Sequence, residues 1–352
     1  DMRDNLSDHL IDRSRSPFSV GRFVDAHWGN EGHFDWQDVP LNTELAWGSR
    51  TGRSGHGNPF FVARNNLWGG YLLAHLGWSA NWQARLFCDY ADNNPRVCLR
   101  CELSPQGIPP LRMIAPGETI QAPEVHVGFC HTDLDTAVQN SHAYLRATVL
   151  RPVPRAGQPV IYNHWSYTEH ELSEEALGRE IDVAADVGAE LFIVDAGWYA
   201  DRGTPWWDTT GDWQAGDRLP RDLFPVFEHA RRRGLACGLW AEIESAAPLS
   251  RLARAHPDWF IQRYGESVPR ILDLAKPDVA AHVEAEIIRL VERYELDLFR
   301  LDYNVQPLEG GFNTRDGVAE NSLWRQTEAI HAIFDRLAHR FPRLQLENCS
   351  SG

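Results

Sequence analysis

Lysine is almost absent from this sequence. Its single lysine, Lys276, lies between Ala275 and Pro277, where a helix is expected to begin. That place is poor for a Schiff-base lysine, and the chain has no Gly-Lys-Ser/Thr end of a phosphate-binding loop. The 352 residues carry a net charge of -15, and 43% of them are hydrophobic. We therefore expect a folded protein that binds a neutral small molecule and no nucleic acid.

Signatures of metal sites are missing too. The sequence has no HExxH and no HxH motif, which removes the usual ligands of a metallohydrolase. Its six cysteines are scattered, and the lone CxxC pair, Cys98 and Cys101, favours two half-buried thiols over a zinc knuckle. We therefore expect no metal and no other cofactor.

Membrane and targeting signals are also lacking. No run of 18 apolar residues is present, so no membrane-spanning segment and no membrane partner are expected. The residues from Asp1 onward show no charged-then-apolar leader, and a cytoplasmic location is the expectation. The sequence leaves open whether the chain forms a homo-oligomer.

The first 150 residues predict an antiparallel β-sandwich. Short aromatic and β-branched runs, broken by Gly, Asn and Pro, occupy residues 58–62, 68–73, 81–87 and 97–103. Residues 115–119 predict a turn before a further strand, and residues 132–150 predict a helix. The Pro- and Gly-rich residues 151–157 predict a linker, so we expect a partial sandwich domain with its linker helix over 1–150 and a catalytic domain over 151–352.

Five apolar runs of the second domain are each followed at once by polar or aromatic residues. The runs are 159–162 before Asn163-His164-Trp165, 191–194 before Asp195-Ala196-Gly197-Trp198, 236–239 before Trp240-Ala241-Glu242-Ile243-Glu244, 296–299 before Arg300-Leu301-Asp302-Tyr303-Asn304, and 344–346 before Glu347-Asn348-Cys349. Because the carboxyl ends of parallel strands meet at one edge, these side chains are expected on one rim.

The segments between these runs predict helices. Ser173 is a candidate N-cap, and Gly188 follows the end of the same amphipathic segment. Pro277 fits a first helical turn, with apolar residues at three- and four-residue steps as far as Tyr294. A further helix is expected over about residues 317–340. Five βα steps predict an incomplete (β/α)8 TIM-type barrel with about five of eight units; a doubly wound open sheet is the alternative, but no Gly-rich phosphate fingerprint supports it.

Asp302 is the strongest candidate for a catalytic group. It lies at the carboxyl end of a predicted strand, where parallel α/β barrels keep their chemistry. An Asp that caps the next helix or pairs with a surface Arg is the alternative. The repetition of polar residues after the other four runs favours the catalytic interpretation.

Tryptophan is abundant, with 14 in 352 residues. Aromatic rings stack on the apolar faces of sugars, although most simply pack in a core or at a rim. In the first domain packing is the expected role. Trp165, Trp198 and Trp240 each follow a predicted barrel strand, and for them packing and a ligand wall stay equal alternatives. The loop 204–213 carries three more tryptophans, which is typical of a lid or a wall.

Eight motifs of the second domain carry a family resemblance. They are Asn163-His164-Trp165, Asp195-Ala196-Gly197-Trp198-Tyr199, Gly211-Asp212-Trp213, Gly238-Leu239-Trp240-Ala241-Glu242, Ala255-His256-Pro257-Asp258-Trp259, Leu272-Asp273-Leu274, Arg300-Leu301-Asp302-Tyr303-Asn304 and Glu347-Asn348-Cys349-Ser350-Ser351-Gly352. Together with Gly55-His56-Gly57-Asn58-Pro59-Phe60-Phe61 upstream, they resemble glycoside hydrolase family 36, the α-galactosidases and their relatives. The resemblance implies a β-sandwich before a (β/α)8 barrel, and retaining hydrolysis of a glycoside or oligosaccharide with a terminal α-galactosyl group.

The resemblance also implies roles for single residues. Asp302 falls on the nucleophile, and Asp195 on a carboxylate that grips sugar hydroxyls. Trp165 and Trp240 fall on walls of the sugar pocket. Arg300 falls on a basic hydroxyl-binding position. Two further residues of the matching motifs, Trp198 and Asn304, complete the predicted substrate-binding set, together with Cys349 on a turn beside the sugar 2-position.

Three positions depart from the family pattern. Ala196 stands where the family commonly has a second Asp, so two acceptors for the axial 4-OH and the 6-OH become one. Arg300 and Leu301 stand where the family commonly has Lys and Trp, and the planar guanidinium changes the geometry of hydroxyl binding. An α-N-acetylgalactosaminidase and a raffinose-type transglycosylase therefore stay as alternatives, as does a catalytically silent carbohydrate-binding homologue.

A retaining mechanism needs two carboxyls about 5 to 5.5 Å apart. The carboxylates expected on the rim, besides Asp302, are Asp195, Glu242, Glu244 and Glu347. The resemblance assigns the acid/base to none of them, because it would lie on the next barrel strand. The chain is therefore expected to stop short within the barrel, with the acid/base beyond Gly352.

Overall fold

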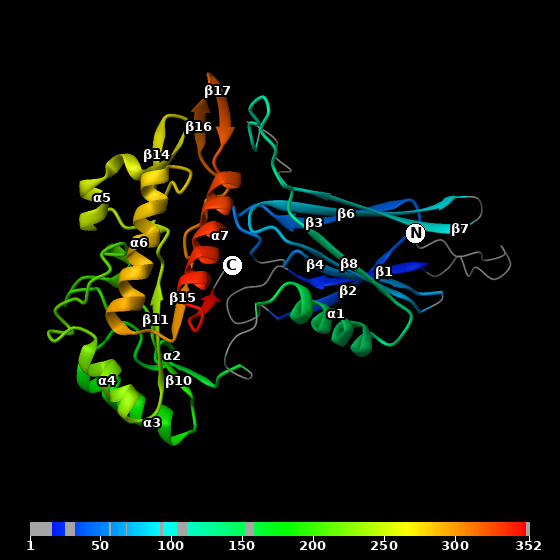
Figure 1. The fold of residues 1–352 in the computed structure, drawn as a ribbon. Helices are drawn as coiled ribbons and strands as arrows, with labels where there is room; N and C mark the ends of the chain where they lie inside the picture. The colour runs from blue at the N-terminus through cyan, green and yellow to red at the C-terminus, as the bar shows by residue number, and fades with distance from the viewer. Residues whose placement is uncertain are drawn as a thin grey trace. The chain divides into compact units, whose positions relative to one another are not determined.

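The fold is that of a computed structural model, which describes residues 16–24, 32–55, 58–67, 69–91, 94–103, 111–151 and 158–349 (Figure 1). The chain divides into two compact units, residues 1–152 and 153–352. Apart from Arg151, the linker expected at 151–157 lies outside the described residues, as do Trp68 and residues 350–352. Within the described residues no helix is long and apolar enough to cross a membrane.

The first unit contains two antiparallel sheets. Their strands are β1 (Phe18–Phe23), β2 (Phe34–Val39), β3 (Thr43–Ser49), β4 (Phe60–Asn65), β5 (Tyr71–Leu76), β6 (Trp82–Ala91), β7 (Asn94–Glu102) and β8 (Val125–Cys130). One sheet has the order β2-β1-β4-β5-β8 and the other β3-β6-β7. All their pairings are antiparallel, as the sequence predicts.

Alternation along the strands explains how these sheets form. In β6 the residues Trp82, Ala84, Leu86 and Cys88 are buried and alternate with half-buried neighbours, the period-2 pattern of a strand with one covered face. The CxxC pair lies on β7 as two free thiols: Cys101 is half-buried, whereas Cys98 is exposed. The expectation of two half-buried thiols is therefore wrong for Cys98.

The helix expected at residues 132–150 is confirmed as α1 (Leu134–Thr148). Its N-cap, Asp133, accepts a hydrogen bond from the backbone N–H of Thr136, which satisfies one of the free donors of the first turn. Ala137 of α1 packs against Val62 of β4 and Leu73 of β5. The helix therefore covers one face of the larger antiparallel sheet.

The second unit is built on a parallel sheet. Its strands are β9 (Ile161–Asn163), β10 (Leu191–Val194), β11 (Ala236–Ala241), β15 (Leu298–Leu301) and β18 (Gln345–Asn348). They lie side by side in chain order, β18-β15-β11-β10-β9, and every pairing is parallel. Neighbours that follow one another along the chain are typical of a barrel wall and not of a doubly wound sheet, in which the strand order reverses. The structure thus supports a half-barrel.

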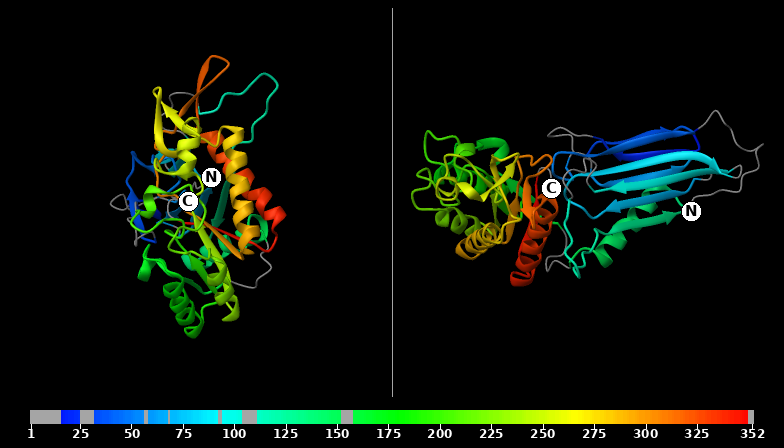
Figure 2. Two further views of the ribbon diagram at one scale, coloured as in Figure 1. Left: turned by 90° about the vertical axis from the view of Figure 1, so that its left-hand side faces the viewer. Right: turned by 90° about the horizontal axis from the view of Figure 1, so that it is seen from above.

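The longer helices of this unit are α3 (Glu174–Asp186), α4 (Phe224–Arg232), α6 (Pro277–Tyr294) and α7 (Leu323–Arg340). Ser173 caps α3 through a hydrogen bond from the Ala176 N–H, and Pro277 occupies the first turn of α6, as expected. Figure 2 shows α6 and α7 lying side by side, and an ion pair joins Arg336 to Glu284 across them. Their buried faces close one side of the core.

The shorter elements lie in the connections between parallel strands. They are α2 (Trp165–Thr168), η2 (Trp206–Asp208), β12 (Ser245–Ala246), α5 (Arg251–Ala255), η3 (Pro257–Trp259), β13 (Phe260–Arg263), β14 (Glu266–Leu272), β16 (Phe312–Arg315) and β17 (Val318–Asn321). The strands β12, β14 and β13 form a small antiparallel sheet, and β16 and β17 form a hairpin.

That hairpin corrects the start of the last helix. The sequence predicts that a helix begins at about residue 317, but α7 begins at Leu323. Asp316 and Gly317 both have positive φ, 50° and 79°, and they form the two-residue loop between the paired residues Arg315 and Val318. An Asp-Gly pair with two positive φ angles is the preferred hairpin turn, and this local preference outweighs the helical periodicity that follows.

Candidate active site

The residues expected on one rim do lie at the carboxyl ends of neighbouring strands. Asp195 follows β10, and Asp302 follows β15. Arg300 is paired in register with Trp240 of β11 on one side and with Glu347 of β18 on the other. The parallel register therefore places these side chains in adjacent rows at one end of the sheet.

Asp302 is largely buried, with 8% of its surface exposed. Its Oδ2 accepts hydrogen bonds from the indole N–H of Trp240 at 3.0 Å and from the side-chain amide of Asn304 at 2.8 Å. Its Oδ1 accepts one from the backbone N–H of Tyr303 at 2.7 Å. Three neutral donors thus fix the orientation of the carboxylate, and no salt bridge forms with it among the described residues.

Asp195 is equally buried, with 7% exposed. Its Oδ2 accepts a hydrogen bond from the Asn163 amide at 2.7 Å and lies 3.6 Å from the Arg300 guanidinium. Burial raises the pKa of Asp195, while donation from the Ala196 N–H and from Asn163 and the charge of Arg300 act in the opposite direction. The carboxylate is an acceptor that already has a cation beside it.

His164 holds the backbone of Asp195 in place. Its Nε2 accepts a hydrogen bond from the Asp195 N–H at 2.9 Å, and its Nδ1 lies 3.0 Å from the Thr168 hydroxyl. Burial lowers the pKa of His164 to about 4. The imidazole is therefore neutral at ordinary pH, as its acceptor role at Nε2 requires.

Arg300 of β15 contacts two carboxylates, Glu347 of the neighbouring β18 and Asp195 after β10. Its guanidinium lies 2.8 Å from Oε1 of Glu347, in addition to its contact with Asp195. The buried Nε of Arg300 and Oε2 of Glu347 have no hydrogen-bond partner among the described residues. One spare donor and one spare acceptor in this row could be satisfied by the hydroxyls of a ligand.

Glu242 and Glu244 do not lie on an open rim, which corrects the sequence analysis. Both are completely buried. Glu244 accepts a hydrogen bond from Gln326. Glu242 accepts two hydrogen bonds from Asn304, and burial raises its pKa from 4.5 to about 8, with the charge of Asp302 acting in the same direction. The sequence puts these residues just past a strand, but the chain there turns back into the core.

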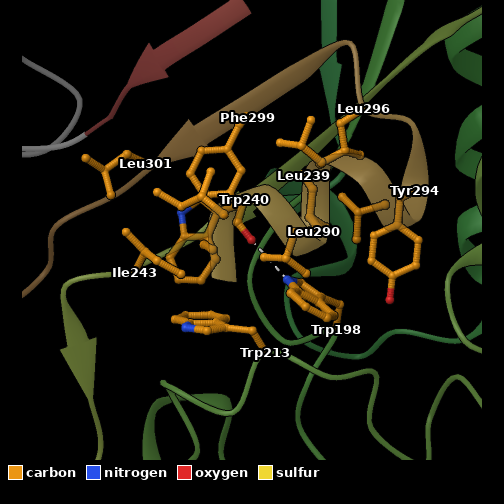
Figure 3. Close-up of a cluster of buried hydrophobic side chains, with 14 of the residues drawn as sticks. Trp198, Trp213, Leu239, Trp240, Ile243, Leu290, Tyr294, Leu296, Phe299 and Leu301 are labelled. Carbon is orange, nitrogen blue, oxygen red and sulfur yellow. Dashed lines mark hydrogen bonds between the residues drawn. The ribbon is translucent and has the colours of Figure 1, made fainter. Parts of the chain in front are cut away.

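Trp198, Trp213 and Trp240 pack against one another in the buried core (Figure 3). Trp198 is completely buried, and its indole N–H donates to the backbone carbonyl of Trp240 at 3.0 Å. Trp213 packs next to both, at ring-centroid distances of 6.2 Å and 6.3 Å. Trp198 therefore has no exposed surface for a ligand and supports Trp240, which itself is 1% exposed and reaches the site through its N–H.

The loop 204–213 brings a further tryptophan against this group. The ring of Trp206 lies edge-on to Trp165, with centroids 5.6 Å apart, and edge-on to Trp240, at 5.9 Å. Trp165 and Trp206 are both half-buried. The two rings form a partly exposed aromatic wall beside Trp240, which agrees with the expected wall.

Arg270 of β14 fastens that loop and was missed by the sequence analysis. Its guanidinium lies 4.5 Å from the centre of the Trp207 ring, donates to the Trp207 carbonyl at 2.6 Å and lies 3.4 Å from Asp208. Its φ of 74° is unusual for a residue other than Gly. Its separation of more than 60 residues from the loop left no local signal in the sequence.

The remaining predicted residues also lie at strand ends. Cys349 follows β18, is half-buried, and donates its backbone N–H to the carbonyl of Leu301 at 2.8 Å. Asn304 is exposed as a residue. Among the described residues, no group of three or more His, Cys, Asp or Glu side chains is arranged to hold a metal ion.

Comparison with known proteins points to one family. The Melibiase family model matches residues 119–352. The Escherichia coli α-galactosidase is 28% identical over 321 residues, covering 86% of this chain and 43% of the relative. The α-galactosidase AgaA of Geobacillus stearothermophilus is 27% identical over 342 residues, covering 92% of this chain and 45% of the relative.

Solved structures give the same result. The crystal structure of GH36 α-galactosidase AgaA A355E in complex with 1-deoxygalactonojirimycin matches with a TM-score of 0.82 and 25% identity, over 96% of this chain and 48% of that one. The chain thus spans less than half the length of the curated relatives and structures named here. The family model, the relatives and the fold agree with the motifs at the strand ends, and the chain belongs to the Melibiase family of GH36 α-galactosidases.

Proposed function

We propose that this chain carries the nucleophile half of the active site of a retaining glycoside hydrolase that cleaves terminal, non-reducing α-galactosides. The observation that carries the proposal is the setting of Asp302. Its carboxylate follows a strand of a GH36-type half-barrel and is oriented by three neutral donors, and no residue in the described part of the chain forms a salt bridge with it. A carboxylate held in this way can attack an anomeric carbon.

The reaction has two displacements. A carboxylate oxygen of Asp302 forms a bond to the anomeric carbon while the bond to the leaving oxygen breaks, and a general acid gives that oxygen its proton. Water then attacks the glycosyl-Asp302 ester, loses its proton to the same group acting as base, and releases the sugar and the free carboxylate. Asp195, Arg300 and Asn163 are placed to bind sugar hydroxyls, with Trp165 and Trp206 as a wall.

The proton donor is proposed to come from outside residues 1–352. Glu242 and Glu244 are completely buried, and Glu347 is paired with Arg300 at 2.8 Å. A general acid must face the leaving oxygen, and Glu347 is already held by Arg300. The family resemblance also places the acid on the strand that would follow β18.

A mechanism-based trap tests the proposal. The protein, with any sequence that flanks these 352 residues naturally, is incubated with 2-deoxy-2-fluoro-α-galactosyl fluoride, and the labelled peptide is found by mass spectrometry. A label on Asp302 is expected, and a label on Glu347 would overturn the assignment. A panel of nitrophenyl α-glycosides, including the α-galactoside and the α-N-acetylgalactosaminide, gives the sugar.

Each of the three alternatives from the sequence has its own experimental outcome. Because Ala196 replaces a second carboxylate beside Asp195, preference for the N-acetylated sugar is the competing specificity. Analysis of products with a sugar acceptor present separates transfer from hydrolysis. Sugar binding without any covalent label would identify a catalytically silent relative.

A further inference from the structure

Asn304 connects Asp302 to a carboxyl that is not accessible to any ligand. The side-chain amide of Asn304 donates to Oδ2 of Asp302 at 2.8 Å and to Oε2 of Glu242 at 3.3 Å. Its backbone N–H donates to Oε1 of Glu242 at 2.8 Å. Both oxygens of Glu242 thus accept from one residue, and that residue passes its other amide hydrogen to Asp302.

The hydrogen bonds to Glu242 restrict the rotamers of the Asn304 side chain. Asn304 is exposed as a residue and follows the last strand residue, Leu301, in a segment without regular structure. An exposed side chain on such a segment normally samples several rotamers. Asn304 donates two hydrogen bonds to the completely buried carboxyl of Glu242, in the segment after β11. These bonds restrict the Asn304 rotamers, so the amide already points at Asp302.

We propose that Glu242 is a positioning residue, which orients the nucleophile Asp302 through Asn304. The proposal rests on the proposed function of Asp302. The proposal explains why Glu242 is a carboxyl at all. Its desolvation lowers the stability of the folded state, and an apolar side chain in the same place would avoid that cost. Within the described residues, Asn304 donates both hydrogen bonds that the Glu242 carboxyl accepts.

The alternative that Glu242 is itself the acid/base is disfavoured by its location. None of its surface is exposed, and both oxygens are engaged. A purely structural role is the other alternative. It predicts loss of stability without a selective loss of chemistry, and this difference can be measured.

Two substitutions of Glu242 remove the link in different ways. Glu242→Gln places an N–H₂ group against one of the two Asn304 donors, so the Asn304 amide must turn and present its oxygen to Asp302. Glu242→Met removes both acceptors and fills the space with an apolar chain, which buried positions commonly tolerate. In both variants kcat should fall about 10- to 100-fold, the loss expected for one hydrogen bond to a charged group, with KM changed less than about threefold.

Glu244→Gln is the matched control. Glu244 is two residues away, completely buried, and also accepts a hydrogen bond from a side-chain amide, that of Gln326. The substitution brings the same chemical change into the same strand connection, but its Gln326 partner lies outside the link from Glu242 through Asn304 to Asp302. We expect kcat within about threefold of the unchanged protein, whatever the change in thermal stability.

A double-mutant cycle identifies the route. Asn304→Ala alone should lower kcat and the rate of labelling of Asp302 by the fluorosugar trap. Glu242→Met added to Asn304→Ala should then have little further effect, because the link is already gone. Additive losses would show that Glu242 acts by another route, and unchanged kcat in Glu242→Met or Asn304→Ala would overturn the proposal.

The measurements separate this inference from the proposed function. They use the protein with any natural flanking sequence, and near-ultraviolet circular dichroism shows that each variant is folded. If the unchanged protein labels at Asp302 while the Glu242 variants label equally fast, only the positioning role is wrong. If the unchanged protein neither labels at Asp302 nor hydrolyses an α-galactoside, the proposed function is wrong. The role of Glu242 in orienting a nucleophile then fails with it.

Discussion

Asp195 and Asp302 lie in settings that are alike in four respects. Each follows a parallel strand, each is more than nine-tenths buried, and each accepts the backbone N–H of its own next residue. Each also accepts the side-chain amide of an asparagine, Asn163 at 2.7 Å or Asn304 at 2.8 Å. The two turns are thus near copies of one local design.

The remaining partner differs. Asp195 has the guanidinium of Arg300 beside it, whereas Asp302 has the neutral indole N–H of Trp240. A cation stabilises the charged form and holds it as a fixed acceptor, while a neutral donor orients a carboxylate and leaves its charge available for attack. A similar turn can therefore serve binding after β10 and chemistry after β15.

The strongest test of this contrast is Asp302→Ala. If Asp302 is the nucleophile, removing it should lower kcat by several orders of magnitude and leave substrate affinity largely intact. Steady-state kinetics and isothermal titration with a galactoside measure the two effects. A loss confined to affinity would assign Asp302 to binding and remove the distinction.

Asp195→Ala should give a smaller and different loss. Sugar hydroxyls left unpaired in a buried site cost about 1 to 3 kcal/mol, which corresponds to roughly 5- to 150-fold. Because contacts to sugar hydroxyls form in the bound ground state and strengthen in the transition state, both KM and kcat should worsen. Unchanged kinetics would mean that Asp195 only caps its turn.

Trp240→Phe sharpens the comparison by deleting the neutral donor alone. The ring remains in the tryptophan stack, but Oδ2 of Asp302 loses one of its two side-chain hydrogen bonds. We expect kcat to fall about 10-fold, the size of one hydrogen bond to a charged acceptor. Trp213→Phe, in the same stack at 6.3 Å from Trp240, is the control and should change kcat much less.

The pH dependence of the free energy of unfolding reports on the buried carboxyl of Glu242. Burial raises the pKa of Glu242 from 4.5 to about 8, so between these values the folded chain binds more protons than the unfolded chain. The free energy of unfolding should therefore fall as pH rises through this window, by at most about 1.4 kcal/mol per pH unit from this group.

Glu242→Gln should remove that slope. Chemical denaturation at pH 7 to 8 is the useful measurement, because His164, whose pKa is lowered from 6.5 to about 4 on folding, is then mostly neutral in the unfolded chain as well. Parallel pH curves for the variant and the unchanged chain would show that Glu242 is ionised throughout, contrary to the expected pKa.

The sequence predicted the strand ends well and the connections poorly. Apolar runs with polar ends, such as the one before Asp302, mark buried parallel strands by composition alone. The burial of Glu242 and Trp198 has no such mark, because it depends on where the chain turns after the strand. The β-hairpins 260–272 and 312–321 were missed for a similar reason: their strands are short and mostly polar.

The contact between Arg270 and the loop 204–213 marks a further limit of prediction from sequence. The Arg270 guanidinium lies over the Trp207 ring because the fold brings β14 and the loop together. These two segments are far apart in the sequence. The three tryptophans of the loop predicted a wall, and the half-buried Trp206 fits that prediction. The residue that anchors the loop could not be named without coordinates.

The single proton of His164 gives the site a spectroscopic signature. Because Nε2 accepts the backbone N–H of Asp195, the proton of the neutral ring must reside on Nδ1, facing Thr168. This tautomer is the rarer one for histidine in water, so its ¹⁵N shifts would stand apart from those of exposed histidines. They should stay constant from pH 8 down to about 5, reporting that β9 and β10 remain joined while other groups titrate.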